Sequence, residues 1–275
     1  MTIRADEYIR LIACDLDGTL MGEDLEFSPR LLRAIRRAQD RGITITIATG
    51  RGFPTTRHFA QRLGTTAPLV CYQGAQVRLG DGTLLFRANL PRAYLPEVIG
   101  LCRAQHRELT VYCEDEIYQA TQMYDPAYYD RWFSLPRHLV GDLMTALPGE
   151  PVKFLAIATS REDGDRLEED VRALAAHRFQ VVRSHAWFVE GLASGVSKGD
   201  GLARLAQYLG IQREAVMAMG DSGNDASMVE WAGIGVAIGS ASADVKAVAD
   251  VIAPPLAEDG AAWAIERYAL GEQGG

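Results

Sequence analysis

The chain has 275 residues, of which 48% are hydrophobic and 23% are charged, and its formal net charge is −8. This composition is typical of a globular protein with a sizeable buried core. The negative balance argues against nucleic acid as a partner, because binding to a phosphate backbone needs clustered Lys and Arg. One group of arginines lies on the polar side of a helical pattern, so we interpret it as a solvated face: Arg33, Arg36, Arg37 and Arg41.

Membrane and export signals are not apparent in the sequence. No apolar run approaches the roughly 20 residues that a membrane-spanning helix needs, and no signal-type apolar core opens the chain. We therefore expect no membrane partner. The cysteines lack paired CxxC spacing, which favours free thiols in a reducing compartment and predicts a cytoplasmic protein: Cys14, Cys71, Cys102 and Cys113.

The first third of the chain alternates apolar or β-branched runs with helical patterns. Ser28 followed by Pro29 is typical of a helix start, and Gly42 is typical of a helix end. This alternation of strands and helices predicts right-handed crossovers and a parallel sheet. We expect strands at residues 9–14, 43–48 and 69–72, and helices at residues 29–41 and 56–63.

The pattern changes in the middle of the chain. Residues 77–86 are typical of a hairpin, with Gly80-Asp81-Gly82 at its turn. Hairpins then mix with helices as far as about residue 193, which indicates a separate α+β unit. We expect helices at residues 95–106 and 165–177, a hairpin at 109–120, and strands within 152–159 and 179–190.

The alternating order resumes after this middle part. We expect strands at residues 215–219, 234–238 and 251–253, and helices at residues 201–209, 225–231, 243–249 and 258–268. The sequence therefore predicts an α/β protein with a Rossmann-like parallel-sheet core, residues 1–83 and 193–275. Residues 84–192 are predicted to form an inserted α+β domain.

Two acids follow the first predicted strand, in the stretch Asp15-Leu16-Asp17-Gly18-Thr19-Leu20. Side chains two residues apart on a strand point to the same side, so the carboxylates of Asp15 and Asp17 are expected to point the same way. Two ionised carboxylates about 4 Å apart repel by roughly 4 kcal/mol at an effective dielectric constant of about 20. Such a pair needs a cation, a proton on one acid, or both.

Three further polar clusters lie at predicted strand ends or helix starts: Thr49-Gly50-Arg51, Ser197-Lys198-Gly199, and Gly220-Asp221-Ser222-Gly223-Asn224-Asp225. Parallel sheets bind ligands beyond the carboxyl ends of their strands. If the strands that precede Asp15, Thr49 and Asp221 are neighbours, all four clusters share one crevice.

These residue types suit a phosphate monoester and Mg²⁺. Asp15 and Asp221 offer the hard oxygen ligands that Mg²⁺ prefers. Asp15 is also the natural nucleophile, since a carboxylate is ionised at pH 7, and Asp17 can act as general acid and base. The expected phosphate contacts are a hydroxyl, two backbone amides, a cation and a side-chain amide: Thr49, the amides at Gly50 and Leu16, Lys198 and Asn224.

The four motifs, in this order, resemble those of the haloacid dehalogenase superfamily. The long insertion and the final Glu258-Asp259-Gly260 are similar to the Cof-type phosphatases with a large α/β cap, the IIB subclass. The resemblance implies that residues 84–192 form the cap, and that Asp15, Asp17 (through its backbone carbonyl) and Asp221 bind Mg²⁺. It also implies that Asp225 holds Lys198 or a metal-bound water.

The implied activity is hydrolysis of a small phosphorylated metabolite, first of all a sugar phosphate, through an aspartyl-phosphate. Two alternatives remain: a phosphotransferase similar to phosphomannomutase, and a ligand-binding module without catalysis. We expect a monomer, because the motifs complete one site within the chain. Two positions depart from the family pattern: Gln73 and Ser240 stand where members usually carry Asn.

Overall fold

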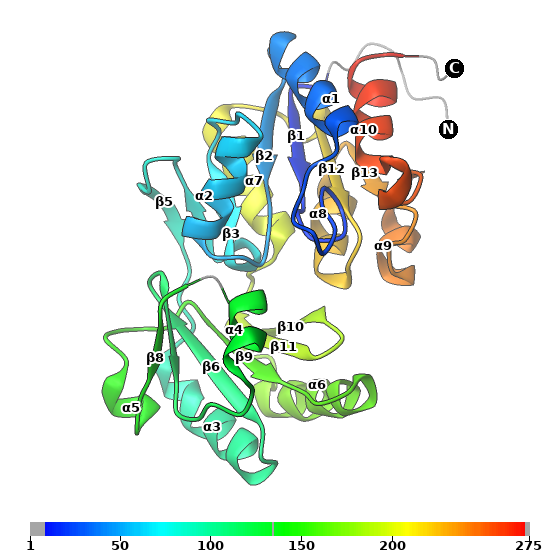
Figure 1. Cartoon of the computed structure of the whole chain (residues 1–275). Coiled ribbons are helices and arrows are strands. Elements are labelled where there is room, and N and C mark those ends of the chain that lie inside the picture. Colours follow the sequence, from blue (N-terminus) through cyan, green and yellow to red (C-terminus); the bar gives the residue numbers. More distant parts are fainter. Residues whose placement is uncertain (1–8, 134, 273–275) are drawn as a thin grey trace. The chain divides into compact units, whose positions relative to one another are not determined.

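The computed structural model describes residues 9–133 and 135–272 (Figure 1). Residues 1–8 and 273–275 of the expected core therefore lie outside the described residues. The chain divides into two compact units. The first comprises Met1–Arg51, Thr56–Phe86 and Ser197–Gly275, and the second comprises Gly52–Thr55 and Arg87–Val196. Within the described part, no helix combines the length and the apolar character that crossing a bilayer requires.

The first unit is built on a parallel sheet of five strands in the order β14-β13-β12-β1-β2. The strands are β1 (Leu11–Cys14), β2 (Thr44–Ile47), β12 (Val216–Gly220), β13 (Ile234–Ala237) and β14 (Val251–Ile252). Ala13 of β1 pairs with Thr46 of β2 on one side and with Ala218 of β12 on the other. The predicted α/β class and parallel core sheet are confirmed.

Helices cover both faces of this sheet. The chain steps from β1 to β2 through α1 (Pro29–Asp40), and in the opposite direction from β12 to β13 through α8 (Ala226–Trp231). Right-handed crossovers in opposite directions place these two helices on opposite faces. Helix α7 (Lys198–Leu209) packs on α8, and α10 (Gly260–Ala264) packs on α1. Helix α9 (Ala243–Val248) contacts β13.

The third predicted strand does not belong to the parallel sheet as expected. Strand β3 (Leu69–Cys71) pairs antiparallel with β4 (Gln76–Arg78), and with β5 (Leu84–Arg87) they form a separate three-stranded sheet. A single parallel bridge between Ala48 and Val70 links this sheet to the end of β2. Helix α2 (Phe53–Arg62) connects β2 to β3 and begins three residues earlier than expected. The tight turn after β3 reverses the direction of the chain, so β4 runs antiparallel beside β3.

The second unit has a six-stranded sheet, ordered β10-β11-β9-β6-β7-β8. Leucine and valine side chains of α3 and α6 pack with alternate residues of β6 and β9, Phe154 of β9 among them, to form its core. The structure adds one strand and two short helices that the sequence did not predict, β8, α4 and α5. The bounds are α3 (Leu95–Ala104), β6 (Glu108–Cys113), β7 (Glu116–Gln119), α4 (Pro126–Trp132), β8 (Arg137–Leu139), α5 (Leu143–Ala146), β9 (Lys153–Ile157), α6 (Arg161–Ala175), β10 (Phe179–His185) and β11 (Phe188–Ala193).

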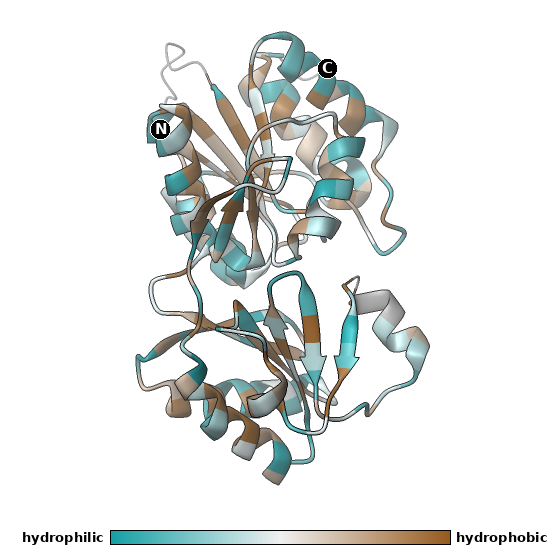
Figure 2. Cartoon of the chain, turned by 90° about the vertical axis from the view of Figure 1, so that its left-hand side faces the viewer, coloured by the Kyte–Doolittle hydropathy of each residue, from teal (hydrophilic) through white to brown (hydrophobic). Residues whose placement is uncertain are grey.

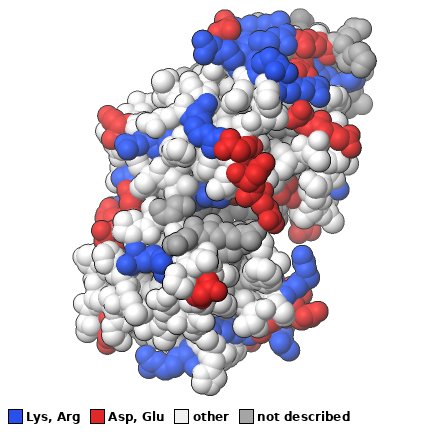
Figure 3. All heavy atoms as spheres, viewed as in Figure 1, with Lys and Arg blue, Asp and Glu red and all other residues white. Residues whose placement is uncertain are grey.

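Burial follows the predicted pattern in the first unit. The strands of its sheet are mostly coloured as hydrophobic in Figure 2, and all residues of β1 are buried. The four arginines predicted to be solvated are exposed, and basic side chains gather at the end of the first unit that carries α1 in Figure 3. Arg36 pairs with Asp40, and Arg37 pairs with Glu272. All four cysteines are buried free thiols, also as predicted.

Candidate functional site

The predicted polar clusters lie at adjacent strand ends of the first unit. Asp15 follows the last residue of β1, Thr49 follows β2, and Asp221 follows β12. Because β12, β1 and β2 are consecutive and parallel in the sheet, their carboxyl ends meet at one edge. The condition stated for these clusters, that the three strands are neighbours, is therefore met. Lys198 joins this edge from the first residue of α7, where Ser197 accepts a hydrogen bond from the Asp200 amide as the cap.

Lys198 lies between two carboxylates and is almost fully buried, with 1% of its surface exposed. Its Nζ donates to Asp15 Oδ1 at 2.7 Å and to Asp225 Oδ1 at 2.5 Å. Burial alone lowers the pKa of Lys198, but the combined attraction of Asp15 and Asp225 outweighs burial and raises the pKa above its ordinary value. The ammonium group is therefore a permanent positive charge at the end of β1.

Three acids surround this ammonium group. One carboxylate oxygen from each of Asp15, Asp221 and Asp225 lies within 4.8 Å of the others. Burial, followed by repulsion from Asp225, raises the pKa of Asp15 well above its ordinary value, although Lys198 opposes the shift. The same two causes raise the pKa of Asp221 to about 6. One ammonium does not balance two buried carboxylates and a partly buried one, so the cluster suits an added divalent cation.

Asp225 uses both of its oxygens within the protein. Oδ1 accepts from Lys198, and Oδ2 accepts from the backbone amides of Asp221 and Ser222, both at 3.0 Å. Asp221 accepts from two neutral hydroxyl groups: Thr19 donates to Oδ1 at 2.8 Å, and Ser222 donates to Oδ2 at 3.0 Å. Asp225 is therefore suited to orient Lys198 and the loop, and Asp221 is suited to bind a metal.

Asp17 lies at the same edge but faces a partner that the sequence analysis did not identify. Arg51 donates from Nε to Asp17 Oδ2 at 2.7 Å and from Nη2 to Oδ1 at 2.6 Å. The Asp17 side chain remains 49% exposed. The signal was present in the sequence, since Arg51 belongs to the Thr49-Gly50-Arg51 turn, but its spacing from Asp17 gives no indication of a contact.

The predicted phosphate contacts lie around this edge. Thr49 is buried, and its hydroxyl accepts from the Arg51 amide at 3.2 Å. Leu16 is buried directly beside Asp15. Asn224 donates from Nδ2 to Gln73 Oε1 at 2.9 Å, which brings Gln73, absent from the predicted site, to the same place. The structure thus brings the predicted site residues together and adds Arg51 and Gln73.

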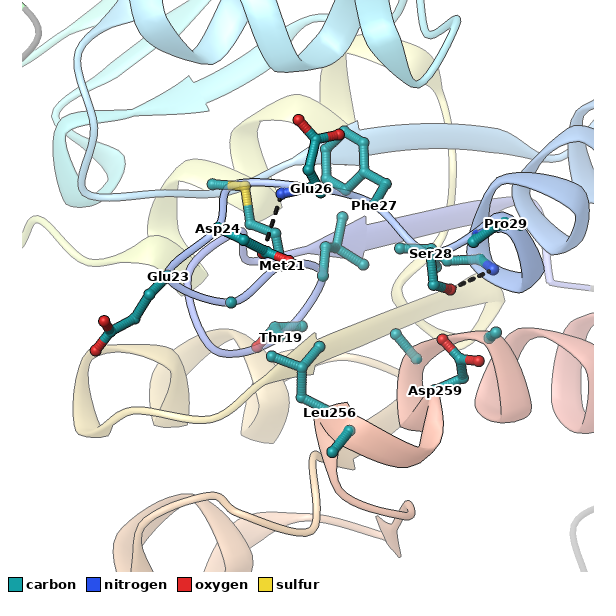
Figure 4. Close-up of a pocket in the computed structure, with 16 residues that line it drawn as sticks. Thr19, Met21, Glu23, Asp24, Glu26, Phe27, Ser28, Pro29, Leu256 and Asp259 are labelled. Atoms are coloured by element: carbon teal, nitrogen blue, oxygen red, sulfur yellow. Dashed lines mark hydrogen bonds between the residues drawn. The ribbon is translucent and has the colours of Figure 1, made fainter.

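A separate pocket of about 540 Å³ lies beside this edge, between the loop after β1 and the segment that begins α10 (Figure 4). Phe27 and Leu256 contribute apolar lining, and Asp259 contributes a carboxylate. Thr19 also lines the pocket and donates to Asp221, so the pocket borders the acidic cluster. Its described lining residues include no Lys or Arg. The pocket therefore offers no cation for a phosphate group, unlike the edge that carries Lys198.

Comparison with known proteins agrees with the four motifs and with this geometry. A family model described as haloacid dehalogenase-like hydrolase matches residues 12–265. The chain belongs to this family. It is accordingly a phosphoric monoester hydrolase of the haloacid dehalogenase superfamily, as the motifs predicted.

Two curated relatives of this haloacid dehalogenase-like chain match over nearly their whole length. Both are 5-amino-6-(5-phospho-D-ribitylamino)uracil phosphatases of Bacillus subtilis: YitU is 31% identical, with 94% of this chain and 97% of the relative covered. YcsE is 29% identical, with 97% of this chain and 98% of the relative covered. A solved haloacid dehalogenase-like hydrolase from Bacteroides thetaiotaomicron is 30% identical, with a TM-score of 0.81 over 94% of this chain and 99% of that chain.

Proposed function

We propose that this phosphatase uses Mg²⁺ and an aspartyl-phosphate intermediate to hydrolyse a small phosphorylated metabolite. The observation that carries the proposal is the buried ammonium of Lys198, held between Asp15 and Asp225 at 2.7 and 2.5 Å. A carboxylate at the end of a strand, beside a fixed cation and further acids, is an arrangement suited to phosphoryl transfer. It supplies a nucleophile and a positive charge for the transferred group.

The residues present fit a magnesium ion. Asp15 and Asp221 supply carboxylate oxygens, and the backbone carbonyl of Asp17 is the third protein ligand that we propose. Mg²⁺ prefers hard oxygen ligands and usually retains waters and substrate phosphate oxygens, so a few protein ligands suffice. When bound, the ion neutralises charge on the phosphoryl oxygens and on the acids. Burial, followed by repulsion from Asp225, raises the pKa values of Asp15 and Asp221, and a bound cation would oppose both shifts.

In the first step, a carboxylate oxygen of Asp15 forms a bond to phosphorus, and the bond from phosphorus to the ester oxygen breaks. The ester oxygen leaves with the electron pair and takes a proton from the Asp17 carboxyl group. Lys198 and the side chains of Thr49 and Asn224, together with the amides at Leu16 and Gly50, hold the phosphoryl oxygens.

In the second step, water attacks phosphorus and gives its proton to Asp17. The bond from phosphorus to the Asp15 oxygen breaks, which releases phosphate and regenerates both carboxyl groups in their starting states. Arg51 holds Asp17 through two hydrogen bonds in the substrate-free structure. Proton transfer at Asp17 therefore requires this pair to open or to shift on substrate binding.

The substrate class that we propose is a phosphate monoester on a sugar or on a sugar-derived chain. The relatives named for 5-amino-6-(5-phospho-D-ribitylamino)uracil act on a phosphate that is carried by a ribityl chain. A sugar phosphate presents the same phosphate ester on a polyhydroxylated carbon chain. We further propose a cytoplasmic monomer, because the four buried thiols suit a reducing compartment and one chain supplies the whole cluster.

The test is phosphate release from sugar phosphates, the ribitylaminouracil phosphate, nucleotides and p-nitrophenyl phosphate. Each is assayed with Mg²⁺, with EDTA, and with Asp15→Asn. Asp40→Asn on the exposed face of α1 is the matched control. We expect release that requires both Mg²⁺ and Asp15. Transfer of the phosphoryl group to an added sugar, without release to water, would favour the phosphotransferase. Metal binding by folded protein without release from any ester would favour a non-catalytic module.

A further inference from the structure

We propose that Gln73 is a positioning residue of the phosphate site, which acts by holding Asn224 and by supporting the Thr49–Gly50 turn. This inference rests on the function proposed above. Gln73 lies in the turn between β3 and β4 and is 1% exposed. Gln73 does not belong to any of the four motifs. It follows β3, a strand of the separate three-stranded sheet.

Two of its contacts reach segments that we assign to phosphate binding. Asn224 donates from Nδ2 to Gln73 Oε1 at 2.9 Å. The backbone amide of Gln73 donates to the Thr49 carbonyl at 3.0 Å. The Gln73 side chain also fills the space beside Gly50, where a Cβ atom would lie only 2.4 Å from Gln73 Nε2. One side chain thus lies between the turn after β2 and the loop after β12.

The backbone around Gln73 is held in an unfavourable conformation. Three consecutive residues have positive φ: Tyr72 at 52°, Gln73 at 60° and Gly74 at 94°. Non-glycine residues adopt this region at a cost in free energy, and such strain persists only where the surroundings enforce it. The Tyr72 amide donates to the Arg51 carbonyl at 3.0 Å, which fixes the turn.

Gly74 fixes the other side of the turn. A Cβ atom at Gly74 would lie 1.9 Å from the Ser197 carbonyl oxygen, so the turn packs directly on the residue that caps α7. Lys198 is the next residue along the chain. The strained turn is therefore packed between the segment that carries Thr49 and the segment that carries Lys198, and the Gln73 side chain extends from it to Asn224.

Asn224 has capacity left for a ligand. Its Oδ1 is buried and has no hydrogen-bond partner among the described residues. The hydrogen bond to Gln73 uses one of the two Nδ2 hydrogens, which leaves one donor and one acceptor on the amide. Because Gln73 accepts at a fixed point, it selects which end of the Asn224 amide faces the site. An amide without this partner can rotate and present the oxygen, which repels a phosphate.

The length of the side chain matters for this contact. An asparagine side chain is one methylene shorter than a glutamine side chain. From the same strained backbone, the shorter side chain would not span the distance that Gln73 covers to Asn224. We therefore expect Gln73→Asn to lose the contact while it keeps a polar residue that tolerates positive φ.

The test compares Gln73→Gly and Gln73→Asn with Asn224→Ala and with the double variant Gln73→Gly/Asn224→Ala. Gly removes the side chain and relieves the positive φ, so this variant is expected to fold, which thermal unfolding checks. Gln212→Gly, exposed before β12 and away from Asp221, is the matched control. The readouts are kcat, KM and the inhibition constant of inorganic phosphate, all with Mg²⁺.

We expect Gln73→Gly and Gln73→Asn to raise KM and the phosphate inhibition constant about tenfold, the effect of one lost hydrogen bond, with a smaller change in kcat. In the Asn224→Ala background, Gln73→Gly should raise KM little further, because the side chain through which Gln73 acts is already removed. Unchanged KM in both Gln73 variants, or full additivity in the double variant, would overturn the inference. Either result leaves the proposed function intact, since the wild-type protein releases phosphate in the same assay.

Discussion

Arg51 holds Asp17 through two parallel hydrogen bonds, at 2.7 Å from Nε and 2.6 Å from Nη2. The two residues come from different turns, after β2 and after β1, and the guanidinium carbon also lies 5.5 Å from the centre of the Phe59 ring. A planar fork that is both paired and stacked is well fixed. Asp17, the proposed acid and base, is therefore oriented by Arg51. Arg51 belongs to the second motif, but the sequence alone assigned it no role.

Replacement of Arg51 should reduce activity more than stability. Exposed ion pairs contribute about 0–1 kcal/mol to folding, and Asp17 is half exposed, so Arg51→Leu should leave the unfolding midpoint nearly unchanged. Misplacement of a catalytic group by about 1 Å can cost about 10²-fold in rate, so we expect kcat to fall between tenfold and about 10²-fold. Steady-state kinetics and thermal unfolding on the same preparation check both parts.

Arg51→Lys is the matched variant, because it keeps the charge and loses the two-bond fork. Its activity should lie between those of the wild type and Arg51→Leu. A higher kcat in Arg51→Leu than in the wild type would show instead that the pair restrains Asp17, and equal activities would show that the pair has no role in positioning.

Removal of Lys198 should affect both folding and catalysis. Lys198→Met leaves Asp15 and Asp225 buried without their cation, and breaking a buried ion pair typically costs about 3–5 kcal/mol. We expect a loss of this size in urea unfolding of the metal-free protein near pH 8, and a loss of kcat of at least about 10²-fold. Lys246→Met in α9 is the control. The destabilisation should shrink as the pH is lowered, because burial and then Asp225 raise the pKa of Asp15, and its protonation removes its repulsion of Asp225.

The stabilisation of the protein by Mg²⁺ should depend on pH through Asp221. Its pKa in the metal-free folded protein is raised from 3.8 to about 6, chiefly by burial. Between these two values the folded state binds more protons than the unfolded state, so the free energy of unfolding of the metal-free protein falls as pH rises through this window. Mg²⁺ competes with the same proton, so the rise in Tm on adding Mg²⁺ should be large near pH 7.5 and small near pH 5.

The control for this prediction is Asp221→Asn, which removes the titrating group. Thermal unfolding with and without Mg²⁺ across this pH range should then show a small shift at every pH. A wild-type shift that is independent of pH, or larger in acid, would contradict the assignment of Asp221 as a metal ligand.

The parts of the site that follow local patterns could be predicted from sequence. Asp15, Thr49 and Asp221 each end a short apolar strand, and parallel strands bring such ends to one edge. Ser197 caps α7 and places Lys198 at its first residue, as the residue types indicate. The ordered spacing of these local signals was sufficient for the fold class, whereas the strand order that makes them neighbours comes from the structure.

Contacts that depend on unusual backbone or on distant pairs could not be predicted. Positive φ at Tyr72 and Gln73 runs against the preferences of both residues, so nothing local indicates the turn that sends β3 into its own sheet. Gln73 and Asn224 are far apart in the chain, as are Arg51 and Asp17. Strand β8, only three residues long, lacks a clear alternation that would mark it.

The most direct test of the account is to identify the phosphorylated residue during turnover. The enzyme is mixed with its best substrate and Mg²⁺, quenched in acid within the first turnovers, and digested for mass spectrometry. We predict one phosphoryl group on the peptide that contains Asp15, at Asp15 itself, absent with EDTA and absent in Asp15→Asn. Phosphate release that proceeds without a phosphoryl group on Asp15, or with one on another residue, would contradict the proposed nucleophile.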